Sequence, residues 1–288
     1  MKKRLLLLIL CAAIFSGCHQ QQNVQIAATT LPVWEFTQML CDGTEITVSR
    51  LVTENVSCLH DYSVQVSQMR AVESAQAVIC SGAGLEAFLE DVLTHSPYVI
   101  DASEGVTLHC GHDHSHEHDS HAHEHDPHIW LSPSNAKQMC KNICSGLTAI
   151  YPQHAQQFEQ NLAALLQKLD DLQSYGETEL KNLSCRSLVT FHDGFSYFAE
   201  DFDLHILKAV EEESGSEASA KELTELISLV KDNNLPAIFT EVNGSVSAAK
   251  TIAAETDVDI YNLDMGMSGD SYFKAMYHNI DTIKEALG

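Results

Sequence analysis

One long helical pattern organises this 288-residue sequence: residues 152–183 read PQHAQQFEQNLAALLQKLDDLQSYGETELKNL. Apolar residues recur in it at alternating spacings of four and three, which places them on one face of a helix. They are Phe158, Leu162, Leu165, Leu169 and Leu172. Pro152 fits the first turn of such a helix. A helix of about 30 residues is about 45 Å long, which is enough to cross a whole two-lobed protein.

Strand-like and helix-like stretches alternate on both sides of this helix. The expected N-terminal strands are residues 24–30, 46–53, 75–82 and 98–106, with helices at 33–40, 66–74 and 85–93. The expected C-terminal strands are 187–191, 204–210, 237–241 and 258–263, with helices starting at 194 and spanning 218–232, 246–255 and 272–287.

This alternation predicts an α/β fold, because parallel strands need helical crossovers between them. We expect two lobes, each with a mostly parallel sheet flanked by helices, joined by one long backbone helix. The predicted boundaries are 24–150 for the N-terminal lobe, 151–183 for the connecting helix and 184–288 for the C-terminal lobe.

The first 18 residues, MKKRLLLLILCAAIFSGC, have the form of an export signal. A basic head precedes 11 apolar residues, Leu5–Phe15, fewer than the roughly 20 that span a membrane. The ending Phe-Ser-Gly-Cys resembles the bacterial lipobox, in which the cysteine is acylated. We predict a signal peptide over 1–18 and a lipid anchor on Cys18, which tethers the exported protein to the outer face of the cytoplasmic membrane. Cleavage without lipidation is the alternative.

The composition is strongly acidic, with 40 acidic and 16 basic residues and a formal charge of −24. Losing Lys2, Lys3 and Arg4 with the leader makes the charge −27. Such a chain lacks the basic patch that nucleic-acid binding requires. The acidity suits a protein that handles cations, and it is equally explained by solubility through self-repulsion.

Seven cysteines remain beyond Cys11 and Cys18, and an odd number cannot all pair within one molecule. Cys140 and Cys144 are four residues apart on an apolar stripe that follows a Ser132-Pro133 helix start. We expect these two as buried small hydrophobic residues rather than a metal-binding or redox pair.

Residues 109–130, HCGHDHSHEHDSHAHEHDPHIW, hold nine of the 16 histidines. From Gly111 to Asp126 the only apolar residue is Ala122, so the segment cannot offset the entropy of ordering and is expected to be a loop. We expect weak, exchangeable zinc binding there, as a collector beside a tighter site; a solvated acidic loop is the alternative. The candidate histidines are His112, His114, His116, His118, His121, His123 and His125.

Four metal-ligand residues stand near the ends of predicted strands or just beyond the histidine-rich loop. Parallel sheets bind ligands outside the carboxyl ends of their strands. Three imidazoles and one carboxylate form a tetrahedral set suited to zinc. The residues are His60, His128, His192 and Asp264.

Seven stretches, in order and over almost the whole mature chain, resemble the zinc/manganese-type solute-binding lipoproteins (cluster A-I, or cluster 9) of bacterial metal ABC importers. They are SCLHDYSVQVSQM (57–69), SGAGLEAFLEDVL (81–93), DPHIWLSPSNAK (126–137), VTFHDGFSYFAEDFDL (189–204), SAKELTEL (219–226), AIFTEVNGS (237–245) and YNLDMGMSGDSYFKAMYHNI (261–280).

The resemblance implies one metal ligand in each of four segments: His60, His128, His192 and an acid matched by Asp264. Zinc members of this family tend to have histidine at the third place and manganese members glutamate, so His192 favours Zn²⁺, as the softer nitrogen ligand also does. The family also implies an ABC permease as the partner, and we expect the receptor to be a monomer.

Two departures from the family pattern leave parts of this set open. Cys58-Leu59 stands where members often have Asp-Pro, so the thiol is a further candidate ligand, with a disulfide or an unreactive buried thiol as the alternatives. Asp259, Asp270 and Glu241 are rival carboxylates for the fourth place.

We therefore expect a high-affinity extracytoplasmic Zn²⁺ receptor and not an enzyme. Four protein ligands leave no open position for water, and the chain has no His-Glu-x-x-His motif, with Glu241 the only candidate base of a zinc hydrolase. The alternatives are a manganese or iron receptor of the same family and a surface protein for zinc buffering or adhesion.

Deleting residues 111–125 separates the two kinds of zinc binding. We expect the deletion to remove weak binding equivalents and to leave the tight site, because the loop histidines are not among the four ligands. Zinc titration of both proteins measures this, and loss of the tight site contradicts the assignment.

Overall fold

The computed structural model describes residues 25–54, 56, 59, 62–109, 125–210 and 219–288. The predicted signal peptide with Cys18, the ligand His60 with Cys58, and the loop histidines from His112 to His123 lie outside these ranges. Within the described ranges, none of the helices is both long and apolar enough to cross a membrane.

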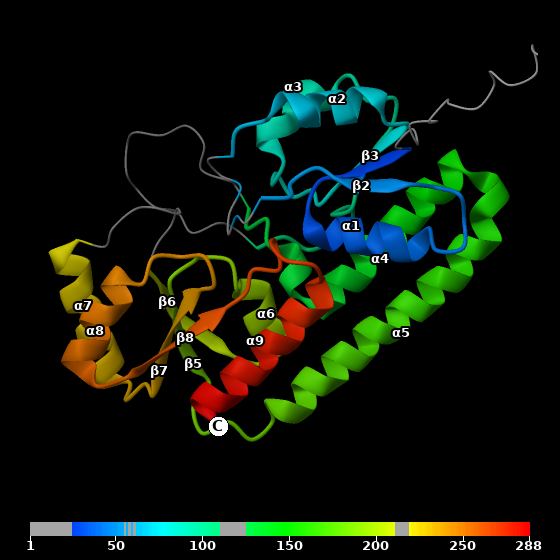
Figure 1. Ribbon diagram of the computed structural model, residues 1–288. Helices are drawn as coiled ribbons and strands as arrows, with labels where there is room; N and C mark the ends of the chain where they lie inside the picture. The colour runs from blue at the N-terminus through cyan, green and yellow to red at the C-terminus, as the bar shows by residue number, and fades with distance from the viewer. Residues whose placement is uncertain (1–24, 55, 57–58, 60–61, 110–124, 211–218) are drawn as a thin grey trace, which may run out of the picture.

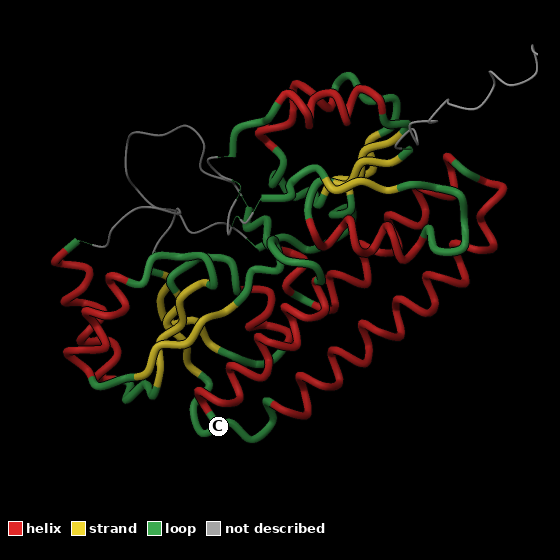
Figure 2. The backbone as a smooth tube through the Cα atoms, in the orientation of Figure 1, coloured by secondary structure: helices red, strands yellow, loops and turns green. Residues whose placement is uncertain are grey.

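Two parallel four-stranded sheets form the framework, as the sequence predicts (Figure 2). Both sheets have the same connectivity: the order is β2-β1-β3-β4 in the first and β6-β5-β7-β8 in the second. The first contains β1 (Ile26–Ala28), β2 (Val48–Arg50), β3 (Ala77–Cys80) and β4 (Val99–Asp101). The second contains β5 (Ser187–Thr190), β6 (His205–Ala209), β7 (Ala237–Glu241) and β8 (Asp259–Leu263).

Helices cover both faces of each sheet, so each lobe has three layers (Figure 1). In the N-terminal lobe they are α1 (Leu31–Leu40), α2 (Val66–Ser74), η1 (Ala87–Leu89), α3 (Glu90–Leu93), η2 (Ile129–Leu131) and α4 (Pro133–Ile150). In the C-terminal lobe they are α6 (Ser196–Asp201), α7 (Ala220–Asp232), α8 (Ser247–Thr256) and α9 (Tyr272–Leu287). The expected helix over 85–93 is instead a 3₁₀ turn followed by a four-residue helix.

The long helix α5 (Ala155–Glu179) follows a 3₁₀ turn, η3 (Pro152–His154), and runs alongside both lobes (Figure 1). It buries Phe158, Leu165, Leu169 and Leu172 of the predicted stripe, and Leu162 is partly buried. The helix ends at Glu179, earlier than the predicted Leu183. There the Arg186 guanidinium donates to the carbonyls of Leu180 and Lys181 (2.8 and 3.4 Å), which satisfies acceptors that the helix leaves unpaired.

One continuous apolar core joins the lobes, since side chains of α1, α4, α5, α6 and α9 belong to the same buried cluster. Buried hydrogen bonds add to it: Trp130 Nε1 donates to the Met265 carbonyl (2.7 Å), and the Tyr272 hydroxyl donates to the Trp130 carbonyl (2.9 Å). Cys140 and Cys144 are buried in this core as free thiols, which confirms their predicted burial.

In the first sheet the strand order reverses between β1 and β3, the place where open parallel sheets usually bind ligands. In this sheet the carboxylate of Glu86 occupies that position. Glu86 is buried and accepts from Thr29 Oγ1 (2.6 Å), Ser81 N (2.7 Å) and Gly82 N (3.0 Å). Burial raises the pKa of Glu86 to about 7, although the three hydrogen bonds oppose the rise.

Gly176 of α5 is buried against the Phe202 ring of the C-terminal lobe. A Cβ there would lie 2.6 Å from Cζ of Phe202, whose ring is packed against Phe198 at a centroid distance of 4.7 Å. Gly176→Ala gains about 1 kcal/mol of helix propensity, but overpacking costs about 1–3 kcal/mol. We expect a melting temperature lower by a few degrees, measured by calorimetry on metal-free protein. Ser174→Ala, at an exposed position of the same helix, is the control and should not lower it.

Candidate metal centre

Two polar side chains lie at the equivalent position of the second sheet, between β5 and β7. His192 follows β5 by two residues, and Glu241 is the last residue of β7. Both are buried, and Glu241 Oε1 lies 3.0 Å from Nδ1 of His192. The predicted placement of His192 at a strand end is therefore confirmed.

The N-terminal lobe supplies His128, directly before η2. Its neighbour Asp126 accepts through Oδ1 from both the backbone nitrogen (3.0 Å) and Nδ1 (2.8 Å) of His128. Burial raises the pKa of Asp126, but hydrogen bonds from His128 and Ser196 outweigh that effect and hold the pKa below its usual range. Asp126 is therefore an anion at neutral pH.

The two imidazoles meet edge to edge. Nε2 of His128 lies 3.1 Å from Nε2 of His192, and the ring planes are 88° apart. A carboxylate can only accept, so Nδ1 of each ring carries the hydrogen, and Nε2 of a neutral ring keeps its lone pair. When both rings are neutral, two lone pairs therefore face each other, and a shared cation makes that arrangement favourable. Two nitrogens on one tetrahedral zinc, each at about 2.0–2.1 Å, are separated by about 3.3 Å, close to the observed spacing.

Gly194 provides the space for this pair. A Cβ there would lie 2.8 Å from Cδ2 of His192 and 3.0 Å from Cγ of His128, and 2.6 Å from Cε of Met265. No sequence pattern pointed to Gly194, which packs against both imidazole rings.

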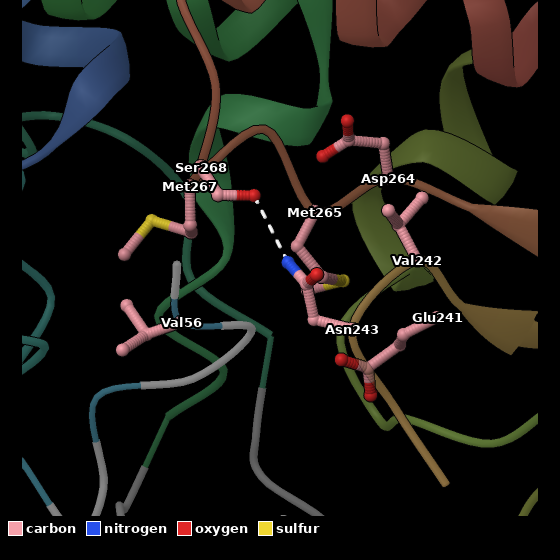
Figure 3. A pocket seen from close by; sticks show the side chains of 8 residues that line it. All are labelled: Val56, Glu241, Val242, Asn243, Asp264, Met265, Met267 and Ser268. Carbon is pink, nitrogen blue, oxygen red and sulfur yellow. Dashed lines mark hydrogen bonds between the residues drawn. The ribbon is translucent and has the colours of Figure 1, made fainter. Parts of the chain in front are cut away.

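Asp264 lines a small pocket beside this pair, together with Glu241, Met265, Met267 and Val56 among others (Figure 3). Its Oδ1 accepts from Gly266 N (2.8 Å). In Figure 3 the carboxylates of Asp264 and Glu241 lie on opposite sides of Val242 and Asn243. Among the described residues, no group of three or more His, Cys, Asp or Glu side chains is arranged to hold a metal. The structure thus brings together His128 and His192, while the fourth ligand stays a prediction.

The rival carboxylates are engaged or exposed. Asp270 pairs with Lys274 (2.8 Å) on the surface, and Asp259 is exposed at the start of β8. Glu241 contacts Nδ1 of His192 rather than the Nε2 that faces His128. Val56, four residues before His60, lines the same pocket as Asp264.

Comparison with known proteins gives a consistent match. Residues 26–286 match the family described as ZnuA, the periplasmic component A of a zinc-uptake complex. The chain is 30% identical over 307 residues to the zinc-binding lipoprotein AdcA of Streptococcus pneumoniae, covering 99% of this chain but only 61% of that protein.

Solved structures agree with that match. A crystal structure of ZnuA superposes with a TM-score of 0.80 at 30% identity, covering 92% of this chain and 99% of the other. The Zn(II)-bound ZnuA-like domain of S. pneumoniae AdcA gives 0.76 at 27% identity, covering 92% and 99%. These matches confirm the predicted fold class.

Gly194→Ala tests the packing at the histidine pair. The added methyl meets ring carbons, which cannot move without separating the two Nε2 atoms, so we expect weaker zinc binding by a competing chelator assay. Gly105→Ala is the control: its positive φ of 74° strains the variant, but an added Cβ there meets nothing within 4 Å. Equal zinc affinity in both variants would contradict the proposed role of Gly194.

Proposed function

Because this chain belongs to the ZnuA family of periplasmic zinc-uptake components, we propose that it is an exported receptor that captures Zn²⁺ and delivers it to the permease of an ABC importer. The observation that carries the proposal is the pair of buried imidazoles, one from each lobe, whose Nε2 atoms face each other at 3.1 Å. Zn²⁺ is the substrate of such a receptor. The family is a class of substrate-binding proteins, and we infer no catalytic role.

The proposed ligand set is His60, His128, His192 and Asp264. Two observations support it: His128 and His192 already lie at a spacing that suits one zinc ion, and Asp264 and Val56 line one pocket beside them. A closed set of protein ligands binds the ion without leaving a position for a reactive water. Cys58 remains a candidate additional ligand.

Two imidazoles favour zinc over manganese, because manganese prefers hard oxygen ligands while nitrogen donors suit zinc. The carboxylates of Asp126 and Glu241 strengthen this preference, since a carboxylate on Nδ1 makes Nε2 a better donor to the metal. A manganese or iron receptor is therefore the less favoured alternative.

The anchor, location, oligomeric state and domain boundaries of the receptor are also proposals. We propose a lipid anchor on Cys18, a monomer on the outer face of the cytoplasmic membrane, and a division into the lobes 24–150 and 184–288 around the connecting segment 151–183. The lipoprotein AdcA supports an anchor by similarity. The histidine-rich segment, of which the structure describes His109 and the residues from His125 onward, is proposed to collect zinc weakly beside the tight site.

Replacing either imidazole tests the function. His128→Ala and His192→Ala each remove one nitrogen donor, so zinc affinity should fall by more than the roughly 10–100-fold that loss of an outer-shell partner causes. His154→Ala is the control, because His154 pairs at 3.1 Å with an exposed glutamate, Glu45, rather than with the histidine pair. Competition titration with a chelator measures all three. Zinc binding of wild-type strength in both ligand variants would contradict the proposed function.

A further inference from the structure

A chain of hydrogen bonds leads from the histidine pair to helix α6 of the opposite lobe. Asp126 Oδ1 holds Nδ1 of His128, and Asp126 Oδ2 accepts from the hydroxyl of Ser196, the first residue of α6. The Asp126 side chain is 10% exposed and that of His128 is 3% exposed. One buried carboxylate therefore joins a residue of each lobe.

The backbone of Asp126 is hydrogen-bonded to Tyr197 of the same helix and to His109. Its carbonyl accepts from the Tyr197 hydroxyl (2.8 Å), and its nitrogen donates to the His109 carbonyl (3.1 Å). The His109 ring stacks on Tyr197 at a centroid distance of 4.1 Å, and its Nδ1 lies 3.2 Å from Ser196 Oγ. Every hydrogen-bonding group of Asp126 is thus occupied, which leaves its carboxylate one orientation.

We propose that Asp126, held by Ser196, is a positioning residue for zinc capture: it fixes the tautomer and ring orientation of His128 so that Nε2 points at His192. This inference rests on the zinc-binding role proposed above. Helix α6 follows His192 in sequence, so the lobe that carries one ligand also orients the ligand of the other lobe. The two Nε2 atoms are then aligned by fixed contacts, and zinc binding loses less conformational entropy than it would with a freely rotating ring.

A second acid that bridges the lobes provides a matched control. Asp201, at the end of α6, also bridges the lobes: its Oδ2 accepts from Ser132 Oγ (2.6 Å) and Ser134 N (3.0 Å) at the start of α4. These hydrogen bonds of Asp201 reach the start of α4 and not the two imidazoles. Replacing it therefore disturbs lobe contacts without releasing His128.

The experiment compares Asp126→Ala, Asp126→Asn, Ser196→Ala and Asp201→Ala in zinc affinity, in melting temperature, and in the visible absorption of bound Co²⁺, which reports ligand geometry. We expect Asp126→Ala to weaken zinc binding by roughly 10–100-fold and to change the Co²⁺ spectrum. Ser196→Ala should weaken binding by about tenfold or less, because it removes one charge-assisted hydrogen bond. Asp126→Asn keeps the shape and should fall between wild type and Asp126→Ala, and it serves if the alanine variant does not fold. Asp201→Ala should lower the melting temperature without changing the Co²⁺ spectrum.

The positioning role is overturned if the Asp126 and Ser196 variants bind zinc as wild type does with an unchanged Co²⁺ spectrum. It is also overturned if Asp201→Ala loses zinc as strongly as Asp126→Ala, since lobe packing would then explain both. Failure of the wild-type protein to bind zinc would instead refute the proposed function.

Discussion

Two imidazole nitrogens held 3.1 Å apart are the interaction on which the rest of this molecule depends. The ring contacts on the far sides of the pair keep the two Nε2 atoms in this arrangement. Asp126 and Glu241 each hold one ring by its Nδ1, and Gly194 leaves room for both rings. The protein stabilises an arrangement that suits a cation shared between the rings.

Such an arrangement requires that the two lobes keep a fixed relation, because one ring comes from each. The shared apolar core, the long helix α5 and the buried hydrogen bonds between Trp130, Met265 and Tyr272 provide that relation. The two sheets have the same connectivity, but different side chains occupy the position where the strand order reverses. In the first, Glu86 fills the position where the strand order reverses, whereas in the second His192 and Glu241 occupy it.

The sequence predicted the elements that depend on regular patterns. Apolar spacing located α5 and the alternating strands, and strand ends pointed to His192. Side chains that act through three-dimensional contacts were harder to find. Asp126 stands in the quoted Asp-Pro-His motif, but only the structure shows that it holds His128, and Glu241 was a candidate ligand before its contact with Nδ1 was visible. Gly194 was expected only as the start of a helix, because its role depends on two rings from different lobes.

The most direct measurement is the position of the ion in a crystal of the zinc-loaded protein, located by anomalous scattering at the zinc edge. We expect one strong peak within about 2.0–2.2 Å of Nε2 of both His128 and His192. Zinc bound only by the histidine-rich segment, with no metal between the rings of His128 and His192, would contradict the proposed site.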